Sequence, residues 1–208
     1  MKTFDLIIVA NLTKNLQMKK IILGALLGTL IYFGFQTIMW VGGFHKNFYT
    51  YAAKQDTVLA ALSANLPAEG HYMMPMADPK SPDFKAQQEQ LEKTMIGNPW
   101  AMIFYHPRME AFSARVLIMG IVYAFIGALI VAFVIYMGKF PCFWSRFTVS
   151  MLFAVFTLAQ GVLSNMNWWS FPWSFIEPQV LDLVFGWGLS SVWLAWFVKN
   201  PDIPAQEK

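Results

Sequence analysis

The segment HYMMPMAD, residues 71–78, gathers side chains that bind soft metal ions. His71 offers an imidazole, and Met73, Met74 and Met76 offer thioethers. Such ligands suit copper(I). The chain has 13 methionines, however, and methionine often fills gaps in apolar surfaces. We therefore favour a packed loop, expect no metal and no cofactor, and keep a copper site at these four residues as the alternative.

A zinc or enzymatic site is a weaker hypothesis. His45, His71 and His106 all fall within residues 44–112, but no two of them have the spacing of ligands on one helix. The sequence also shows no nucleophile–base motif and no phosphate-binding loop. An enzyme acting at the outer face remains an alternative, and we expect no catalytic residues.

Two proline-containing loops carry the candidate ligand-binding residues. Residues 68–80 and 98–108 mix aromatic, proline and polar side chains, and we expect them to lie beside each other. Asp78 precedes a proline, so an extended backbone is favoured and its carboxylate can accept loop N–H groups. Tryptophans near residue 168 could form a floor, which would give an apolar site. The candidate set is Tyr72, Pro75, Asp78, Asn98, Tyr105, His106, Asn165, Trp168 and Trp169.

The composition is that of a membrane protein. Of 208 residues, 57% are hydrophobic and 13% are charged, against roughly 25% charged in soluble domains. The mean hydropathy is +0.45. A single cysteine excludes an intrachain disulfide, and a net charge of +3 gives no nucleic-acid patch. We expect the lipid bilayer as partner, with a protein partner or a second copy of the chain as further candidates, and no nucleic acid.

Four apolar runs are long enough to cross a bilayer as helices, which takes roughly 20 residues. They predict an all-α membrane protein with four transmembrane helices at 21–43, 113–138, 147–166 and 177–198. An N-terminal segment, 1–20, precedes them. A cap (44–112), a short link (139–146) and a Trp-rich hairpin (167–176) connect them, and a tail (199–208) follows.

Lysine and arginine at the span ends predict the orientation. They flank the first span at its start, occupy the 139–146 link and follow the fourth span, whereas 167–176 has none. Both termini are therefore expected in the cytoplasm, and the cap and the hairpin outside. Met18, followed by Lys19 and Lys20, is a second candidate translation start.

Within the cap, residues 47–65 and 81–96 are expected to be helical. The second helix has Ser81 as its N-cap, Pro82 at its first position and Gly97 as its stop signal.

Polar and small residues inside the spans suggest helix contacts. Asp182 and Arg115 lie at similar depth near the outer ends of their spans, and an intramembrane acid is a candidate functional residue. We expect these two to pair, as a structural lock or as a site. Gly24 and Gly28, and Gly120 with Ala124, are small residues four apart, a spacing that lets helix backbones approach closely.

Three motifs resemble a loosely defined family of small bacterial four-span inner-membrane proteins. They are Gly70-x-Tyr72-x-x-Pro75, Asn98-Pro99 with Tyr105-x-Pro107, and Asn165-x-x-Trp168-Trp169-x-Phe171-Pro172. The resemblance implies a shared fold, a cluster of outward-facing loops and a place in the bacterial inner membrane. It implies no chemistry, and the methionines of residues 71–78 lie outside its pattern.

Three functions stay open on the sequence. A structural or accessory subunit of a membrane assembly is favoured, because no catalytic or metal-ligand constellation stands out. Binding or transport of a small apolar or amphipathic ligand between cap and bundle is the first alternative. An outer-face enzyme or a copper-binding protein is the second.

Overall fold

The computed structural model describes residues 2–200, with side chains described from residue 15 on. The chain divides into two compact units. Met1–Thr50 and Ser113–Lys208 form the first, here named the helical unit. Tyr51–Phe112 form the second, named the cap unit. The cap therefore begins about seven residues later than predicted, because the segment after the first helix folds onto the helical unit.

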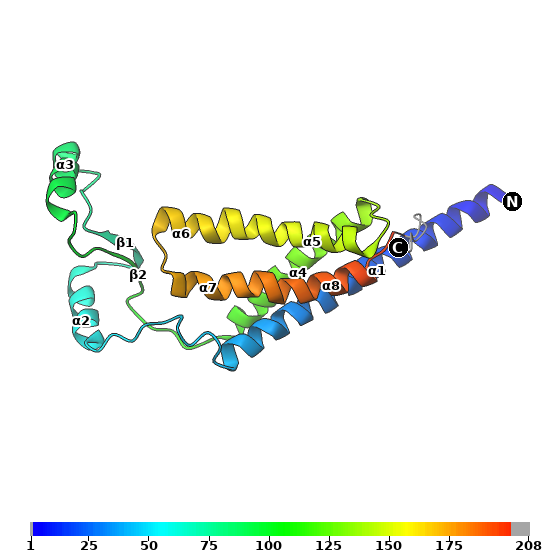
Figure 1. Cartoon of the computed structure of the whole chain (residues 1–208), viewed down its shortest axis with the longest axis horizontal. Coiled ribbons are helices and arrows are strands. Elements are labelled where there is room, and N and C mark those ends of the chain that lie inside the picture. Colours follow the sequence, from blue (N-terminus) through cyan, green and yellow to red (C-terminus); the bar gives the residue numbers. More distant parts are fainter. Residues whose placement is uncertain (1, 201–208) are drawn as a thin grey trace. The chain divides into compact units, whose positions relative to one another are not determined.

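The helical unit holds four helical runs that are long and apolar enough to cross a membrane, as predicted. The first is α1 (Lys2–Val41) and the second is α4 (Ala114–Met137). The third joins α5 (Phe143–Thr157), the π-helix η1 (Leu158–Leu163) and α6 (Ser164–Trp169). The fourth joins α7 (Trp173–Leu181), the π-helix η2 (Asp182–Gly186) and α8 (Trp187–Phe197) (Figure 1).

The turn between the third and fourth runs is shorter than expected. Most of the predicted 167–176 hairpin is helical, and only residues 170–172 connect α6 to α7. Ser170 reverses the chain with φ +53°, and Pro172 precedes the first residue of α7. Because α7 begins at Trp173, Pro178 lies inside this helix and deprives the Ser174 carbonyl of its usual helical N–H donor.

Hydrogen bonds between helices hold the helical unit together. α1 packs against α4 and α8, and α5 packs against α8, whereas α4 and α5 touch sparsely. Ser190 and Trp193 of α8 donate to the carbonyl oxygens of Gly28 and Gly24, both at 3.0 Å. Because lipid offers no competing water, such bonds favour one helix arrangement, at roughly 0.6 kcal/mol each.

Arg146 has a role that the sequence analysis assigned only to topology. Its side chain is 7% exposed, and its Nε donates to the carbonyl of Ala195 at 2.7 Å. That carbonyl belongs to the last turn of α8, where helical donors run out. A guanidinium at a helix C-terminus also complements the helix dipole. Arg146 therefore closes α8 and ties it to α5.

The cap unit contains α2 (Gln55–Asn65), α3 (Phe84–Met95) and two strands, β1 (Gly70–Met74) and β2 (Ala101–Tyr105). The strands pair antiparallel, with Tyr72 opposite Ile103. The two predicted loops thus do lie side by side, but as a small sheet that the all-α prediction did not include. The alternation of exposed and half-buried residues along β1 is typical of a sheet with one covered face.

α3 begins three residues later than predicted. Asp83 is the residue before the helix, and the Ser81 hydroxyl instead accepts the Asp83 N–H at 3.2 Å and the Gln87 amide at 3.0 Å. The helix ends at Met95, and Gly97 follows with φ +86°, as its stop signal predicts.

Candidate functional site

A groove runs along the side of the helical unit where α4 and α5 barely touch. Its volume is about 620 Å³, within the range of small-molecule sites. We name it the side groove. It is lined by Tyr32, Gln36, Gly120, Tyr123, Ala124, Gly127, Ile130, Val131, Phe153, Ala154, Phe156, Thr157, Leu183 and Trp187. Most of these side chains are apolar, and none is a lysine, an arginine or an acid.

Missing side chains on α4 create the space. A Cβ placed on Gly127 would meet no atom within 4 Å, and one on Gly120 would meet only Phe33, at 3.7 Å. Gly120 was expected to bring two helices together, but here it lines a gap. The rims of the groove, Tyr123 and Phe156, are 64% and 67% exposed. In a bilayer these side chains face lipid, so the groove opens sideways.

Gly24 and Gly28, in contrast, lie at a tight helix contact. A Cβ on Gly24 would come within 2.9 Å of Val198, and one on Gly28 within 3.0 Å of Ser190. The first contact is with the residue that follows the fourth helical run, and the second is with α8 inside that run. Small residues four apart thus line a helix contact in α1 and a cavity in α4. The spacing alone does not determine whether another helix packs against these residues.

A buried polar cluster adjoins the side groove. The Gln36 amide nitrogen donates to Asp182 Oδ2 at 2.8 Å and to the Tyr32 hydroxyl at 3.3 Å. His45 Nε2 lies 3.8 Å from Asp182 Oδ1, and neither of these atoms has a hydrogen-bond partner among the described residues. His45 and Asp182 are 7% and 6% exposed. Burying such groups is unfavourable unless they are paired, so the cluster has functional potential.

Asp182 reaches this cluster through an irregular helix. It opens the π-helix η2, which lies about 14 Å along the fourth run at 1.5 Å per residue. Gly186 closes η2, and a Cβ there would come within 2.7 Å of Phe35, so glycine lets α1 approach. π-helices of this kind often occur at functional sites. Nothing in the sequence pattern marks η2 beyond Asp182 itself and the nearby glycine.

His45 is brought over Asp182 by the turn that follows α1. Trp40 packs edge-on against both His45 and Phe48, with ring centroids 4.9 and 5.0 Å apart. Phe48 in turn lies 5.0 Å from Phe175 of α7. These aromatic contacts hold the turn on the end of the helical unit. His45 was assigned to the cap by sequence, but it belongs to this unit.

The predicted Arg115–Asp182 pair is not formed. Asp182 is bonded to Gln36 and faces His45, whereas Arg115 is exposed near the start of α4. The depth estimate was wrong because the fourth helical run begins at Trp173, which places Asp182 deeper than its distance from residue 177 suggested.

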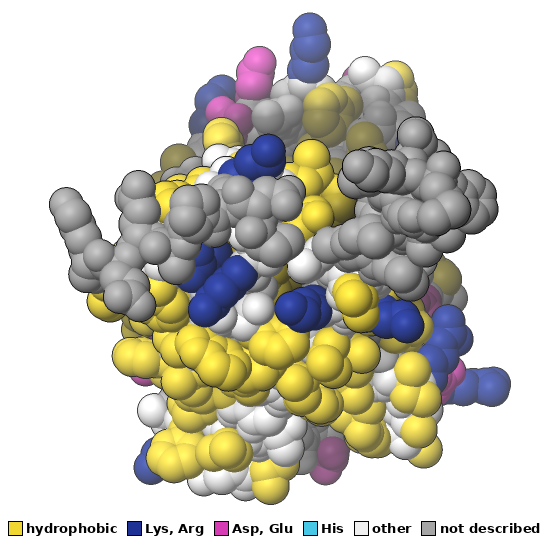
Figure 2. Space-filling view, turned by 90° about the vertical axis from the view of Figure 1, so that its right-hand side faces the viewer, with side chains coloured by type: hydrophobic (Ala, Val, Ile, Leu, Met, Phe, Trp, Pro, Cys, Tyr) yellow, Lys and Arg dark blue, Asp and Glu magenta, His cyan; other side chains and the backbone are white. Residues whose placement is uncertain are grey.

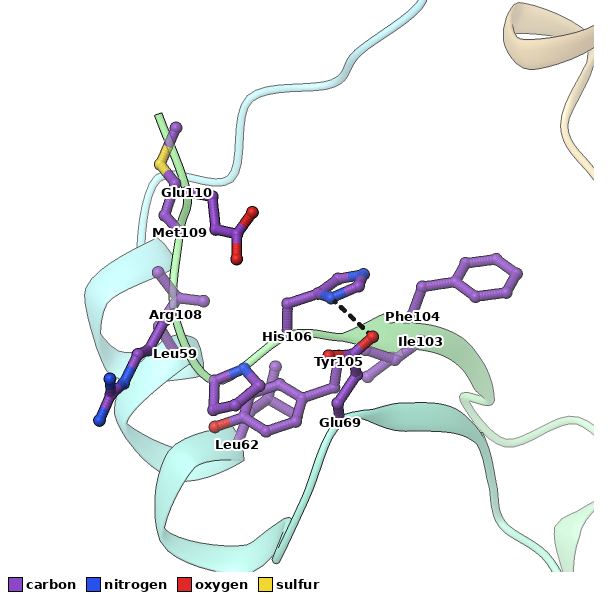
Figure 3. A pocket seen from close by; sticks show the side chains of 11 residues that line it. Leu59, Leu62, Glu69, Ile103, Phe104, Tyr105, His106, Arg108, Met109 and Glu110 are labelled. Atoms are coloured by element: carbon purple, nitrogen blue, oxygen red, sulfur yellow. Dashed lines mark ion pairs between the residues drawn. The ribbon is translucent and has the colours of Figure 1, made fainter. Parts of the chain in front are cut away.

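The cap unit has a cleft of its own, of about 690 Å³. Figure 3 shows Tyr105 and His106 among the side chains around it, with His106 Nδ1 3.3 Å from Glu69. Both members of this pair are more than 60% exposed, so the pair contributes little stability. Of the predicted ligand-binding residues, only Tyr105 and His106 line this cleft.

The other predicted cap residues have structural contacts within the cap. The Tyr72 hydroxyl donates to the Ala68 carbonyl at 2.9 Å, and its ring meets Tyr105 edge-on. Asp78 Oδ1 accepts the Lys80 N–H at 2.9 Å, as predicted. The Asn98 amide donates to the Thr94 carbonyl at 2.8 Å and closes α3. Pro75 borders a small hollow with Trp100.

The tryptophan floor belongs to the other unit. Asn165, Trp168 and Trp169 lie on α6, and all three are exposed on the helical unit. A site formed jointly by cap and tryptophans stays a prediction.

The four copper-ligand candidates do not share one side of the sheet. His71 and Met73 occupy alternate positions of β1 and point to one face, while Met74 points to the other. The His71 ring stacks on Phe104, with centroids 4.6 Å apart. Met76 follows Pro75 beyond the strand and is 61% exposed. Strand geometry therefore separates the ligands that sequence proximity had suggested would converge.

Comparisons with protein families, with curated proteins and with solved structures found no match to this chain. The functional argument consequently rests on the geometry of the side groove and its polar cluster.

Proposed function

We propose that this protein binds a membrane amphiphile, a molecule with a long apolar tail and a small polar head, in the side groove. The observation that carries the proposal is a groove with apolar walls and a pair of polar side chains, Tyr32 and Gln36, at one place in its lining. Apolar walls with a few placed polar groups are the usual make-up of a ligand site.

The surroundings favour a lipid-like ligand. All four helical runs have the length and hydropathy of membrane spans, so the exposed rim of the groove meets acyl chains and not water. Between Gly120 and Val131 the groove follows α4 over about 16 Å, which accommodates an extended hydrocarbon chain. This site lies wholly within the helical unit, and it is distinct from the predicted ligand site between cap and bundle.

The proposal includes an inner-membrane location with both termini in the cytoplasm. Figure 2 views the helical unit from the end that carries the termini, and lysine and arginine side chains gather there above a band of hydrophobic ones. Lys139 and Lys199 lie just beyond span ends on that side, and Lys19 and Lys20 lie in the first two turns of the first span, Asn15–Val41. Positive charge of this kind favours the cytoplasmic side.

Filling the groove tests the proposal. The probe is a long-chain lipid carrying a photoreactive diazirine in its tail, irradiated with the purified protein in nanodiscs. Leucine at Gly127 meets no neighbouring atom at its Cβ, so Gly127→Leu should fold and still occupy the groove. We expect labelling of α4 and α5 in the native protein and roughly tenfold less in the variant.

Gly161→Leu is the matched control. Gly161 also has open space around its Cβ, but it does not line the groove. Equal labelling of the Gly127 and Gly161 variants would contradict the proposal. A stoichiometric protein crosslinked at the groove would support the accessory-subunit function instead.

A further inference from the structure

The orientation of the Gln36 amide is fixed by Asp182. A carboxylate oxygen accepts hydrogen bonds, so the amide nitrogen, and not the amide oxygen, faces Asp182 Oδ2 at 2.8 Å. The same nitrogen donates to the Tyr32 hydroxyl at 3.3 Å. Both amide hydrogens of Gln36 are then engaged inside the protein.

Two hydrogen-bonding functions are left over at the groove. The Gln36 side-chain oxygen is an acceptor without a protein donor among the described residues, and the Tyr32 hydroxyl accepts from Gln36 and keeps its own proton to donate. One acceptor beside one donor complements a hydroxyl group, which offers both.

Charge restricts the head group further. The groove lining contains no lysine, arginine or histidine, so an anionic head would lose its water without gaining a cation. Asp182 lies directly behind Gln36, and the groups that face it are Gln36, Tyr32 and His45. His45 approaches Oδ1, away from the oxygen that binds Gln36.

We propose that the side groove selects uncharged amphiphiles whose head carries a hydroxyl group, such as a long-chain alcohol or a diacylglycerol, over phosphate-bearing lipids. Gln36 and Tyr32 bind the hydroxyl. Asp182 is a positioning residue, because it holds the Gln36 amide so that its oxygen is available. This inference rests on the proposed function and names the ligand class of the same site.

Two probes with the same diazirine-bearing C18 chain test it, one an alcohol and the other an alkyl phosphate. The native protein in nanodiscs should label with the alcohol at least about tenfold more strongly than with the phosphate, the equivalent of about 1.4 kcal/mol. Tyr32→Phe keeps the ring and removes the donor, so alcohol labelling should fall. Tyr136→Phe removes the hydroxyl of a tyrosine of α4 that does not line the groove, and it should leave labelling unchanged.

Asp182→Asn separates positioning from simple structural support. An asparagine can donate as well as accept, so the Gln36 amide is no longer held in one orientation. We expect the Asp182→Asn variant to prefer the alcohol over the phosphate less strongly than the native protein does, while total labelling by the two probes persists. If alcohol and phosphate label the native protein equally and Tyr32→Phe has no effect, the head-group inference fails. If neither probe labels the groove, the proposed function itself fails.

Discussion

Gln36 and Asp182 form the most consequential polar contact between two spans. We predict that Gln36→Leu destabilises the protein by about 1.5–3 kcal/mol, because it leaves a buried carboxylate without its donor. Gln36→Leu with Asp182→Leu should recover part of that loss, since no unpaired charge then remains. The measurement is thermal unfolding in detergent across a double-mutant cycle.

Arg115→Ala supplies the control for this cycle. Arg115 is exposed, so its effect should add to that of Asp182→Leu. Non-additive stability effects at Arg115 and Asp182, with additive effects at Gln36 and Asp182, would show that Arg115 and not Gln36 is the partner of Asp182.

Cys142 should react at lower pH than an ordinary thiol. Hydrogen bonding with the Ser145 hydroxyl, 3.4 Å from Cys142 Sγ, lowers the pKa of this thiol. The thiolate is the reactive form, so the alkylation rate rises as pH increases through the pKa, and here that rise comes early. Rates of maleimide labelling across pH should give a midpoint that moves upward in Ser145→Ala. An unmoved midpoint would mean that Ser145 does not govern the thiol.

At Gly24 and Gly28, α1 packs tightly against α8 and the residue that follows it. We predict that Gly24→Ile and Gly28→Ile each lower stability by about 1–2 kcal/mol or more, because their Cβ atoms would lie within 3.0 Å of Val198 and Ser190. Gly188→Ala is the matched control. Its Cβ would meet nothing within 4 Å, and alanine favours helix by up to about 1 kcal/mol. Thermal unfolding of all three variants tests the contact, and tolerance of isoleucine at Gly28 would contradict it.

The sequence located the helices better than it located their partners. Apolar length alone found all four spans, because a bilayer requires about 20 apolar residues in each. It could not find the Gln36–Asp182 contact, since Gln36 is an ordinary polar residue near the end of an apolar run. The π-helix η2 and the turn that carries His45 over Asp182 also depend on tertiary packing.

Strand pairing in the cap is a second feature that the sequence pattern did not predict. The sequence analysis placed both strands within two loops, 68–80 and 98–108, that contain prolines and aromatics. Alternation along β1 places His71 and Met73 on the face opposite Met74, and it follows only once this segment pairs as a strand, with His71 opposite Phe104.

For the whole molecule, the predicted topology places the cap outside and the 139–146 link inside. In intact cells, Gln90→Cys in a Cys142→Ser background should label with an impermeant maleimide, because Gln90 is exposed on α3. Native Cys142 should label only after lysis, since it lies in the link between α4 and α5. Labelling of Cys142 in intact cells would show that the topology is the reverse of the predicted one. His45 would then lie on the cytoplasmic side.

The three-residue turn at 170–172 bears on how the protein is made. It contains no charged residue, and Arg146–Ala195, Ser150–Ser191 and Trp187–Ser150 all bond α5 to α8. The last two spans can therefore leave the translocon together as a helical hairpin whose polar groups are largely matched before it meets the rest of the chain. Asp182, Ser190 and Trp193 are exceptions. Their partners, Gln36, Gly28 and Gly24, lie on the helix synthesised first, so biogenesis ends when the last hairpin docks on the first helix.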